Sequence, residues 1–228
     1  GIFVFMMLSF FGIILIGVIF GGDSETVEVE NNSVIELNLS DISDDYAGKY
    51  SDPWVTAFSE RKKIGLTDVI NAIEIAETDD AIKGISILNT NSSLGMAQSK
   101  ELRDALNRFK KSGKFIYSYA NNYSQKEYYL NSVATSIYIN PIGELDFKGL
   151  STEVMFFKDF QEKSGLKMEV IRHGKYKSAV EPFLENKMSD ANKEQTMALL
   201  NGIWTNIVED ISKSRNIPVE KLNTIANG

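Results

Sequence analysis

Apolar and polar residues alternate along the chain with two different periods. Strand-like runs occur at 34–39, 84–89, 114–120, 136–141 and 167–172, and helix-like runs at 66–77, 98–113, 124–134, 151–165 and 190–215. Leu102, Leu106 and Phe109 share one face of the second helix, and Gly113 stands where a helix commonly ends. Strands that alternate with helices of this length indicate βαβ crossovers and a largely parallel sheet covered by helices. The pattern therefore predicts an α/β domain.

A different pattern opens the chain. Residues 2–20 carry no charge, and Ser9 is the only polar side chain among them. As a helix with a rise of about 1.5 Å per residue, this run nearly spans a hydrocarbon core of about 30 Å. The acidic stretch "GGDSETVEVE" that follows fits an exported side. We therefore predict a transmembrane anchor at 1–22 and a folded domain at 23–228, and expect the sequence to be part of a longer protein; a signal peptide and a buried helix are the rival interpretations.

Composition removes several classes of function. The net charge is −7, there is no cysteine and there is one histidine. An acidic chain without a basic stripe does not suit nucleic acid, and the missing thiols exclude disulfides and thiolate metal sites. The sequence also lacks G-x-G-x-x-G, P-loop, G-x-S-x-G and H-E-x-x-H motifs. We therefore predict no cofactor, no metal and no nucleic-acid partner.

The stretch "HGKYKSAVEPF" (173–183) holds the candidate chemistry. His173 is the only histidine available for a Ser-His-Asp triad. Lys177 stands out because "SAVEPF" follows it, an apolar turn that could bury its stem, although Glu181 would oppose this if it reached the amine. A lysine that acts as a base near pH 7 must be neutral, which requires its surroundings to disfavour the charge by about 4 kcal/mol. Lys177 could then take a proton from a serine hydroxyl.

The stretches "YKSAVEPF" (176–183), preceded by Gly174, and "NPIGELDFKGL" (140–150) resemble the N-terminal half of the signal peptide peptidase A family in its long, two-domain form. The resemblance implies a ClpP/crotonase-like fold of repeated β-β-α units. It implies a membrane-anchored Ser-Lys serine protease that degrades cleaved, hydrophobic signal peptides, assembles as a homotetramer, and faces the periplasm from the bacterial inner membrane. Carried onto this sequence, the general base is Lys177, and the nucleophilic serine is expected from a C-terminal domain.

The same resemblance indicates that this chain holds half of an active site. The position equivalent to the nucleophile falls on Gln125, beside Ser124, and "NTNSSLGM" (89–96) lacks the Pro-Gly-Gly turn of an oxyanion hole. His173 and Lys175 are then ordinary loop residues. Two alternatives stay open: a catalytically inactive paralogue that anchors or scaffolds a partner, and a self-contained hydrolase that uses Ser124 or Ser178 with Lys177.

Overall fold

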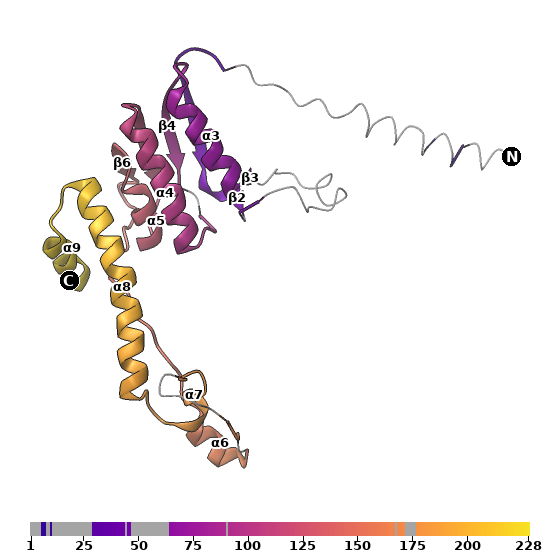
Figure 1. Ribbon diagram of the computed structural model, residues 1–228, viewed down its shortest axis with the longest axis vertical. Coiled ribbons are helices and arrows are strands. Elements are labelled where there is room, and N and C mark those ends of the chain that lie inside the picture. Colours follow the sequence, from indigo (N-terminus) through magenta and orange to yellow (C-terminus); the bar gives the residue numbers. More distant parts are fainter. Residues whose placement is uncertain are drawn as a thin grey trace.

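The computed structural model shows a sheet-containing lobe and a helical arm that projects from it (Figure 1). It describes residues 6–7, 10, 29–43, 45–46, 64–89, 91–166, 168–171 and 177–228. We call the described residues between 33 and 150 the lobe. The described residues between 151 and 203 are the arm, and those between 157 and 192 are the arm tip.

Four parallel strands form the centre of the lobe. They are β1 (Ser33–Asn38), β4 (Ile82–Leu88), β5 (Phe115–Ala120) and β6 (Ser136–Ile139), which pair in that order. The lobe also contains α3 (Leu66–Thr78), α4 (Met96–Lys111), α5 (Gln125–Asn131), a 3-10 helix η1 (Leu39–Asp41), and a two-stranded sheet of β2 (Ile42–Ser43) and β3 (Ile64–Gly65). The predicted α/β class with a mainly parallel sheet is confirmed.

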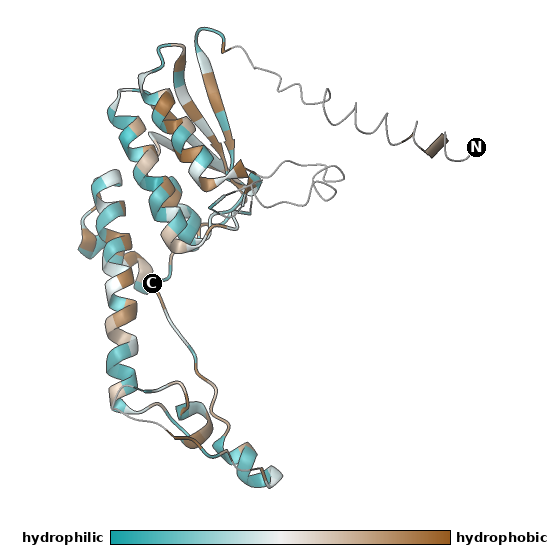
Figure 2. Ribbon diagram, turned by 45° about the vertical axis from the view of Figure 1, so that its right-hand side comes forward, coloured by the Kyte–Doolittle hydropathy of each residue, from teal (hydrophilic) through white to brown (hydrophobic). Residues whose placement is uncertain are grey.

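Helices α3 and α4 bury an apolar core against one face of the sheet (Figure 2). The predicted face of α4 is correct, because Leu102, Leu106 and Phe109 are all 0% exposed. Burying a side chain of this size stabilises the fold by about 1.5–3 kcal/mol. Gly113 follows α4 with φ +89°, a left-handed conformation that glycine adopts without steric cost.

The opposite face of the sheet is rich in aromatic side chains. Tyr117, Tyr119 and Tyr138 are exposed there, and the ring of Tyr117 stacks on Phe115 with 4.7 Å between the ring centroids. Parallel sheets are usually covered on both faces. The described part of the chain covers only one of them.

The chain leaves the lobe after residue 150 and reaches the arm tip, where α6 (Lys158–Ser164) and α7 (Glu181–Leu184) lie. It returns through α8 (Asp190–Arg215) and continues into α9 (Val219–Asn227), beside α8. Ile207, Val208 and Ile211 of α8 are buried in a second apolar cluster with Tyr129 and Phe147 of the lobe. The C-terminal half of α8 is therefore part of the lobe's packing, and its N-terminal half extends away into the arm. The helix predicted at 190–215 is confirmed.

Two predictions for the arm are wrong. Of the helix expected at 151–165, only α6 is helical, and residues 151–157 have no regular secondary structure. These residues connect the lobe to the arm tip, and non-helical chain covers such a connection with about half the residues that a helix needs. The strand expected at 167–172 is absent from the described residues 168–171, because they lie at the arm tip and have no neighbouring strand with which to pair.

The predicted anchor lies almost wholly outside the described residues, and so does its boundary near Gly21 and Gly22. Of the run at 2–20, residues 6, 7 and 10 are described, and they are helical. None of the helices in the described ranges combines the length and the apolar character that crossing a membrane requires.

Candidate functional site

Lys177 precedes α7 of the arm tip by four positions in the sequence. The turn that follows it begins α7 through a hydrogen bond from the Glu181 N–H to the Ser178 carbonyl, at 2.9 Å. The Lys177 side chain is exposed, so among the described residues the apolar turn that could have buried its stem does not do so. The assignment of Lys177 as a base stays a prediction. His173 and Lys175 lie outside the described residues.

Glu181 is a buried charged residue of the arm tip, with 3% of its surface exposed. Its carboxylate accepts hydrogen bonds from Ser189 N at 3.2 Å, Ser189 Oγ at 2.6 Å and Asn192 Nδ2 at 3.0 Å. Ser189 is the N-cap of α8, and Asn192 lies in its first turn. The carboxylate thus joins α7 to the positive end of the α8 dipole, a favourable place for a negative charge.

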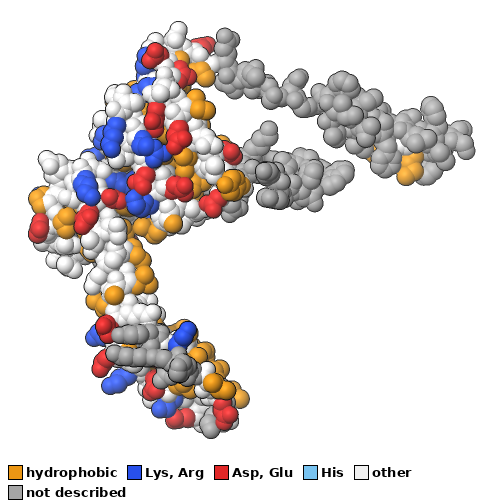
Figure 3. Space-filling view, viewed as in Figure 1, with side chains coloured by type: hydrophobic (Ala, Val, Ile, Leu, Met, Phe, Trp, Pro, Cys, Tyr) orange, Lys and Arg blue, Asp and Glu red, His pale blue; other side chains and the backbone are white. Residues whose placement is uncertain are grey.

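An apolar cavity of about 560 Å³ lies at the arm tip between α6 and α7. Phe157, Phe160, Leu166, Met168 and Phe183 provide its apolar lining. The rings of Phe157 and Phe183 stack with 5.8 Å between centroids. Hydrophobic side chains also gather along the arm and at its tip in the space-filling view (Figure 3). The cavity is large enough to hold apolar side chains of a peptide.

Ser124 acts as a helix cap. Its Oγ accepts from Glu127 N at 3.3 Å, and its backbone N–H donates to Glu127 Oε2 at 3.0 Å, which forms a reciprocal capping box at the start of α5. The Ser124 Oγ also donates to Glu127 Oε2, at 2.8 Å. Glu127 Oε1 also accepts from Ser92 N, at 3.3 Å, in the loop that lacks the Pro-Gly-Gly turn. The backbone N–H of Ser92, which could have faced an oxyanion, is therefore used inside the protein.

Gln125, which the sequence resemblance places at the nucleophile position, is a structural tether. Its Oε1 accepts from Lys148 N at 3.1 Å and from Gly149 N at 2.9 Å, and its Nε2 donates to Gly149 O at 2.9 Å. These bonds hold the segment that leaves the lobe toward the arm. An amide in this position cannot attack a carbonyl group.

The structure does not bring Ser124 to Lys177. Ser124 begins α5 in the lobe, whereas Lys177 precedes α7 at the far end of the arm (Figure 1). Ser178 is adjacent to Lys177 in the chain, but no hydrogen bond among the described residues links its hydroxyl to the lysine amine. The geometry therefore gives no support to a self-contained dyad with Ser124.

Arg103 of α4 is a buried residue that the sequence analysis missed. It is 4% exposed, and its guanidinium lies 5.0 Å from the centroid of the Tyr129 ring. Its desolvation lowers the pKa of Arg103 from the usual value, which the negative charge of Asp210 partly offsets. A sequence signal existed: Arg103 directly follows Leu102 and precedes Leu106 by three positions, on the edge of the buried helix face.

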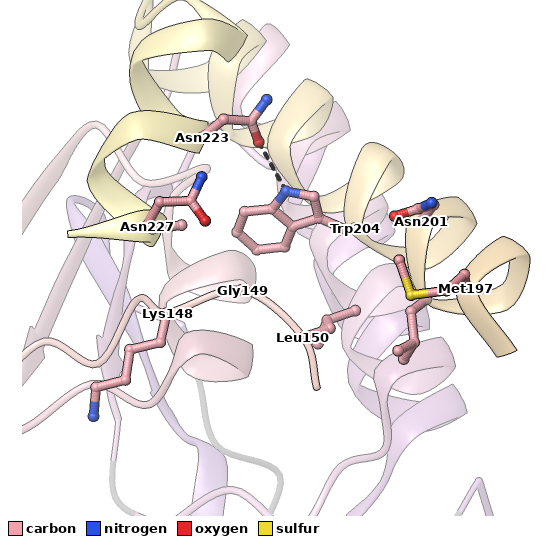
Figure 4. A pocket seen from close by; sticks show the side chains of 10 residues that line it. Lys148, Gly149, Leu150, Met197, Asn201, Trp204, Asn223 and Asn227 are labelled. Carbon is pink, nitrogen blue, oxygen red and sulfur yellow. Dashed lines mark hydrogen bonds between the residues drawn. The ribbon is translucent and has the colours of Figure 1, made fainter. Parts of the chain in front are cut away.

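A second, smaller pocket of about 190 Å³ lies between α8, α9 and the segment that Gln125 holds (Figure 4). Trp204 forms one wall, and its indole N–H donates to Asn223 Oδ1 at 2.8 Å. Among the described residues that line it, Lys148 alone is titratable; its ammonium points away from Trp204 and pairs with Asp146 at 2.9 Å. These described lining residues therefore include no acid–base pair. Across the described ranges, no cluster of three histidine or carboxylate side chains could hold a metal ion.

Comparison with known proteins finds consistent similarity. The profile of Peptidase family S49 matches residues 108–228. The chain is 36% identical over 211 residues to Protease 4 of Haemophilus influenzae, an alignment that covers 88% of this chain and 34% of that protein. It is 36% identical over 159 residues to Protease 4 of Salmonella typhi, covering 69% and 26%. It is 31% identical over 199 residues to the chloroplastic serine protease SPPA of Arabidopsis thaliana, covering 87% and 28%. The chain spans about a third or less of the length of these relatives.

Proposed function

The chain belongs to peptidase family S49, as its resemblance to signal peptide peptidase A predicted, and we propose that the full-length protein is a serine endopeptidase with Lys177 as its general base. The observation that carries this proposal is the family match over residues 108–228, which includes the whole lysine-bearing stretch. The relatives' names, Protease 4 and serine protease SPPA, support the same activity.

We assign the two halves of the Ser-Lys dyad to different parts of the protein. The lobe supplies no nucleophile at the expected position, because Gln125 stands there and is hydrogen bonded to residues 148 and 149. We expect the serine from a C-terminal domain, in a part of the protein that corresponds to the unaligned length of the relatives. That additional part of the protein would also cover the exposed Lys177 and supply the desolvation that a neutral lysine requires.

The substrate that fits the arm tip is a hydrophobic peptide, in particular a signal peptide after its release. The apolar cavity lined by Phe157, Phe160 and Phe183 lies in the same arm tip as Lys177, where it could hold the peptide's side chains. We further propose a ClpP/crotonase-like fold and an anchor at 1–22 in the bacterial inner membrane, with the catalytic domain on the periplasmic side. The open aromatic face of the sheet supports the proposed homotetramer, because parallel sheets are usually covered on both faces.

The test replaces Lys177 by alanine in the full-length protein, with Lys187→Ala as the control. Both lysines are exposed in the arm tip, so neither change should alter the free energy of unfolding by more than about 0.5 kcal/mol. Loss of a general base typically lowers the rate by about 10²–10⁴-fold. We expect that loss for Lys177→Ala, together with loss of fluorophosphonate labelling of the serine, while Lys187→Ala stays fully active. Peptidase activity retained in folded Lys177→Ala would remove the base assignment.

Labelling of residues 23–228 expressed alone tests the division of the dyad. We expect no fluorophosphonate adduct on this part, provided that circular dichroism shows it to be folded. An adduct here would place a nucleophile within the chain and favour the self-contained hydrolase. Absence of any adduct and of any peptidase activity in the full-length protein would favour the inactive scaffold.

A further inference from the structure

The arm joins the lobe at two places, which we call its roots. The outgoing root is the segment that Gln125 holds at Lys148 and Gly149. The returning root is the C-terminal half of α8, which packs on α5 through the cluster around Tyr129 and Ile211. Apolar packing of this kind is non-directional, so it permits small changes of angle between α8 and the lobe. The direction of the arm therefore also depends on the hydrogen bonds that are made at these two roots.

Arg103 makes four of the directional contacts at the returning root, beside the bond that Arg215 Nη1 of α8 donates to Ala134 O at 3.0 Å. One guanidinium nitrogen, Nη1, donates to Tyr129 O at 2.6 Å and to Ser132 Oγ at 2.7 Å, both at the C-terminal end of α5. The other, Nη2, donates to Asp210 O at 2.8 Å and to Ser214 Oγ, both on α8. A guanidinium is planar and its donors have a fixed geometry, so these four bonds set α5 and α8 in one mutual orientation.

The surroundings of Arg103 reinforce this arrangement. The Tyr129 hydroxyl donates to Asp210 Oδ2 at 2.9 Å, so the residue beneath the guanidinium binds α8 as well. The Asp210 carboxylate also lies 3.9 Å from the ammonium of Lys100 on α4. Because Arg103 is almost fully buried, water cannot replace a lost acceptor without local opening.

We infer that Arg103 is a positioning residue that sets the direction of the arm and thereby the location of Lys177. The arm acts as a lever. From Ser189 to Asp210, α8 is about 30 Å long, so a tilt of about 2° at the root moves the arm tip by about 1 Å. A displacement of about 1 Å between reacting groups can lower a rate by about 10²-fold. The catalytic consequence rests on the proposed function, whereas the orientation of the arm does not.

The experiment measures arm orientation and activity separately in the full-length protein. Glu101→Cys on α4 and Glu162→Cys on α6 provide exposed sites for a pair of spin labels, because residues 1–228 contain no cysteine; any cysteine elsewhere in the full-length protein is first replaced by serine. Pulsed electron paramagnetic resonance, on labelled protein diluted into unlabelled protein, gives the distribution of distances between lobe and arm tip. The first variant is Arg103→Lys, which keeps the positive charge but loses the planar guanidinium with its two donor nitrogens. The second is Ser214→Ala, a milder change that removes one hydrogen-bond acceptor on α8.

Arg108→Lys is the matched control, because Arg108 lies on the same helix and pairs with Glu74 of α3, within the lobe, at 2.7 Å. We expect Arg103→Lys to broaden the distance distribution by several ångströms, Ser214→Ala to broaden it less, and Arg108→Lys to leave it unchanged. In parallel, kcat should fall by about 10²-fold in Arg103→Lys while KM stays within about twofold, because the substrate cavity is intact. If Arg103 only stabilised the fold, Arg103→Lys would lower the thermal stability without lowering kcat selectively over KM.

Unchanged distance distributions in folded Arg103→Lys and in Ser214→Ala would overturn the inference. A broadened distribution with unchanged kcat would leave Arg103 as the residue that orients the arm and would instead contradict the catalytic role of Lys177. The failure of the inference and the failure of the proposed function are therefore distinguishable.

Discussion

Replacing Glu181 by glutamine is the sharpest test of how the arm tip is held together. The Glu181 carboxylate is buried and receives three hydrogen bonds from Ser189 and Asn192, at the start of α8. Glutamine has nearly the same shape, but it has one acceptor oxygen instead of two and carries no charge. Its amide N–H group would face N–H or O–H donors of α8, so at least one hydrogen bond would be lost.

The size of the effect follows from these contacts. A hydrogen bond to a charged group contributes about 1.5–3 kcal/mol, and a negative charge at a helix N-terminus contributes about 0.3–1 kcal/mol more. Glu181 is almost fully buried, so solvent does not screen these interactions. We therefore expect Glu181→Gln to destabilise the arm tip by about 2–4 kcal/mol.

This loss should be local. The arm tip has its own small apolar cluster and lies apart from the core of the sheet (Figure 2). A loss of 2–4 kcal/mol corresponds to an increase of roughly 30- to 1,000-fold in the opening equilibrium of the tip. Hydrogen exchange with mass spectrometry on the full-length protein should show this acceleration in peptides covering residues 181–195 and no change in residues 102–120.

Glu185→Gln is the matched control, because Glu185 is exposed at the other end of α7 and should tolerate the change. Unchanged protection of residues 181–195 in Glu181→Gln would refute the assignment of Glu181 as the link between α7 and α8. Equal acceleration in the sheet would show that arm and lobe open as one unit, and would refute the local character of the effect.

Three further predictions concern the lobe. Gly143→Ala should lower the free energy of unfolding by about 1–3 kcal/mol, because a Cβ atom there would lie 1.9 Å from the backbone oxygen of Asn121. Urea titration measures this loss, and an unchanged midpoint would contradict the close approach of the two backbone segments. Gln125→Ala should cost about 1–2 kcal/mol, because Lys148 N, Gly149 N and Gly149 O all lose their hydrogen-bond partner; an unchanged midpoint in urea would contradict the tether. Burial raises the pKa of Tyr123 above the value of about 10 that an unfolded tyrosine has. The contribution of Tyr123 to the free energy of unfolding should therefore be constant below about pH 10 and fall as the pH rises further. Tyr123→Phe should reduce the alkaline loss of stability measured by urea unfolding at about pH 9–11.

The fold of the lobe could be predicted because each element there buries one apolar face. Leu102, Leu106 and Phe109 recur at helical spacing, and the helix and its buried face follow from that spacing. The arm was harder to predict, because its segments show similar periodicity but have no adjacent core against which an apolar face could pack. Residues 151–157 resemble a helix and residues 168–171 resemble a strand, but the first connect two parts of the chain and the second have no strand beside them. The spacing of apolar residues predicts which face of an element is apolar, but it does not predict which other element packs against that face.

The candidate site shows a similar limit. Lys177 was identified through the motif around it, since nothing in its spacing distinguishes it from other surface lysines. The tether formed by Gln125 depends on the backbone of residues 148 and 149, more than twenty positions away. Arg103 lies on a buried helix face, but its four acceptors come from the C-terminal end of α5 and from α8. Only tertiary packing brings these two helices together, so the sequence near Arg103 does not reveal the acceptors. Local pattern therefore predicts the helices, and long-range packing decides what each polar side chain does.

The exposure of Lys177 bears directly on how such a protease could be controlled. A lysine accepts a proton only when its amine is neutral, and burial is what makes the neutral form accessible. In the described chain, no surface covers Lys177, while Glu181 is held by α8 and Arg103 fixes the arm from its root. The arm therefore presents the lysine in a defined place before any burial occurs. Under the proposed function, the surface that brings the serine also desolvates the lysine, so the nucleophile and an active base arise in the same step. We expect the chain alone to be inert toward peptides for this physical reason, and peptide hydrolysis by folded residues 23–228 would contradict it.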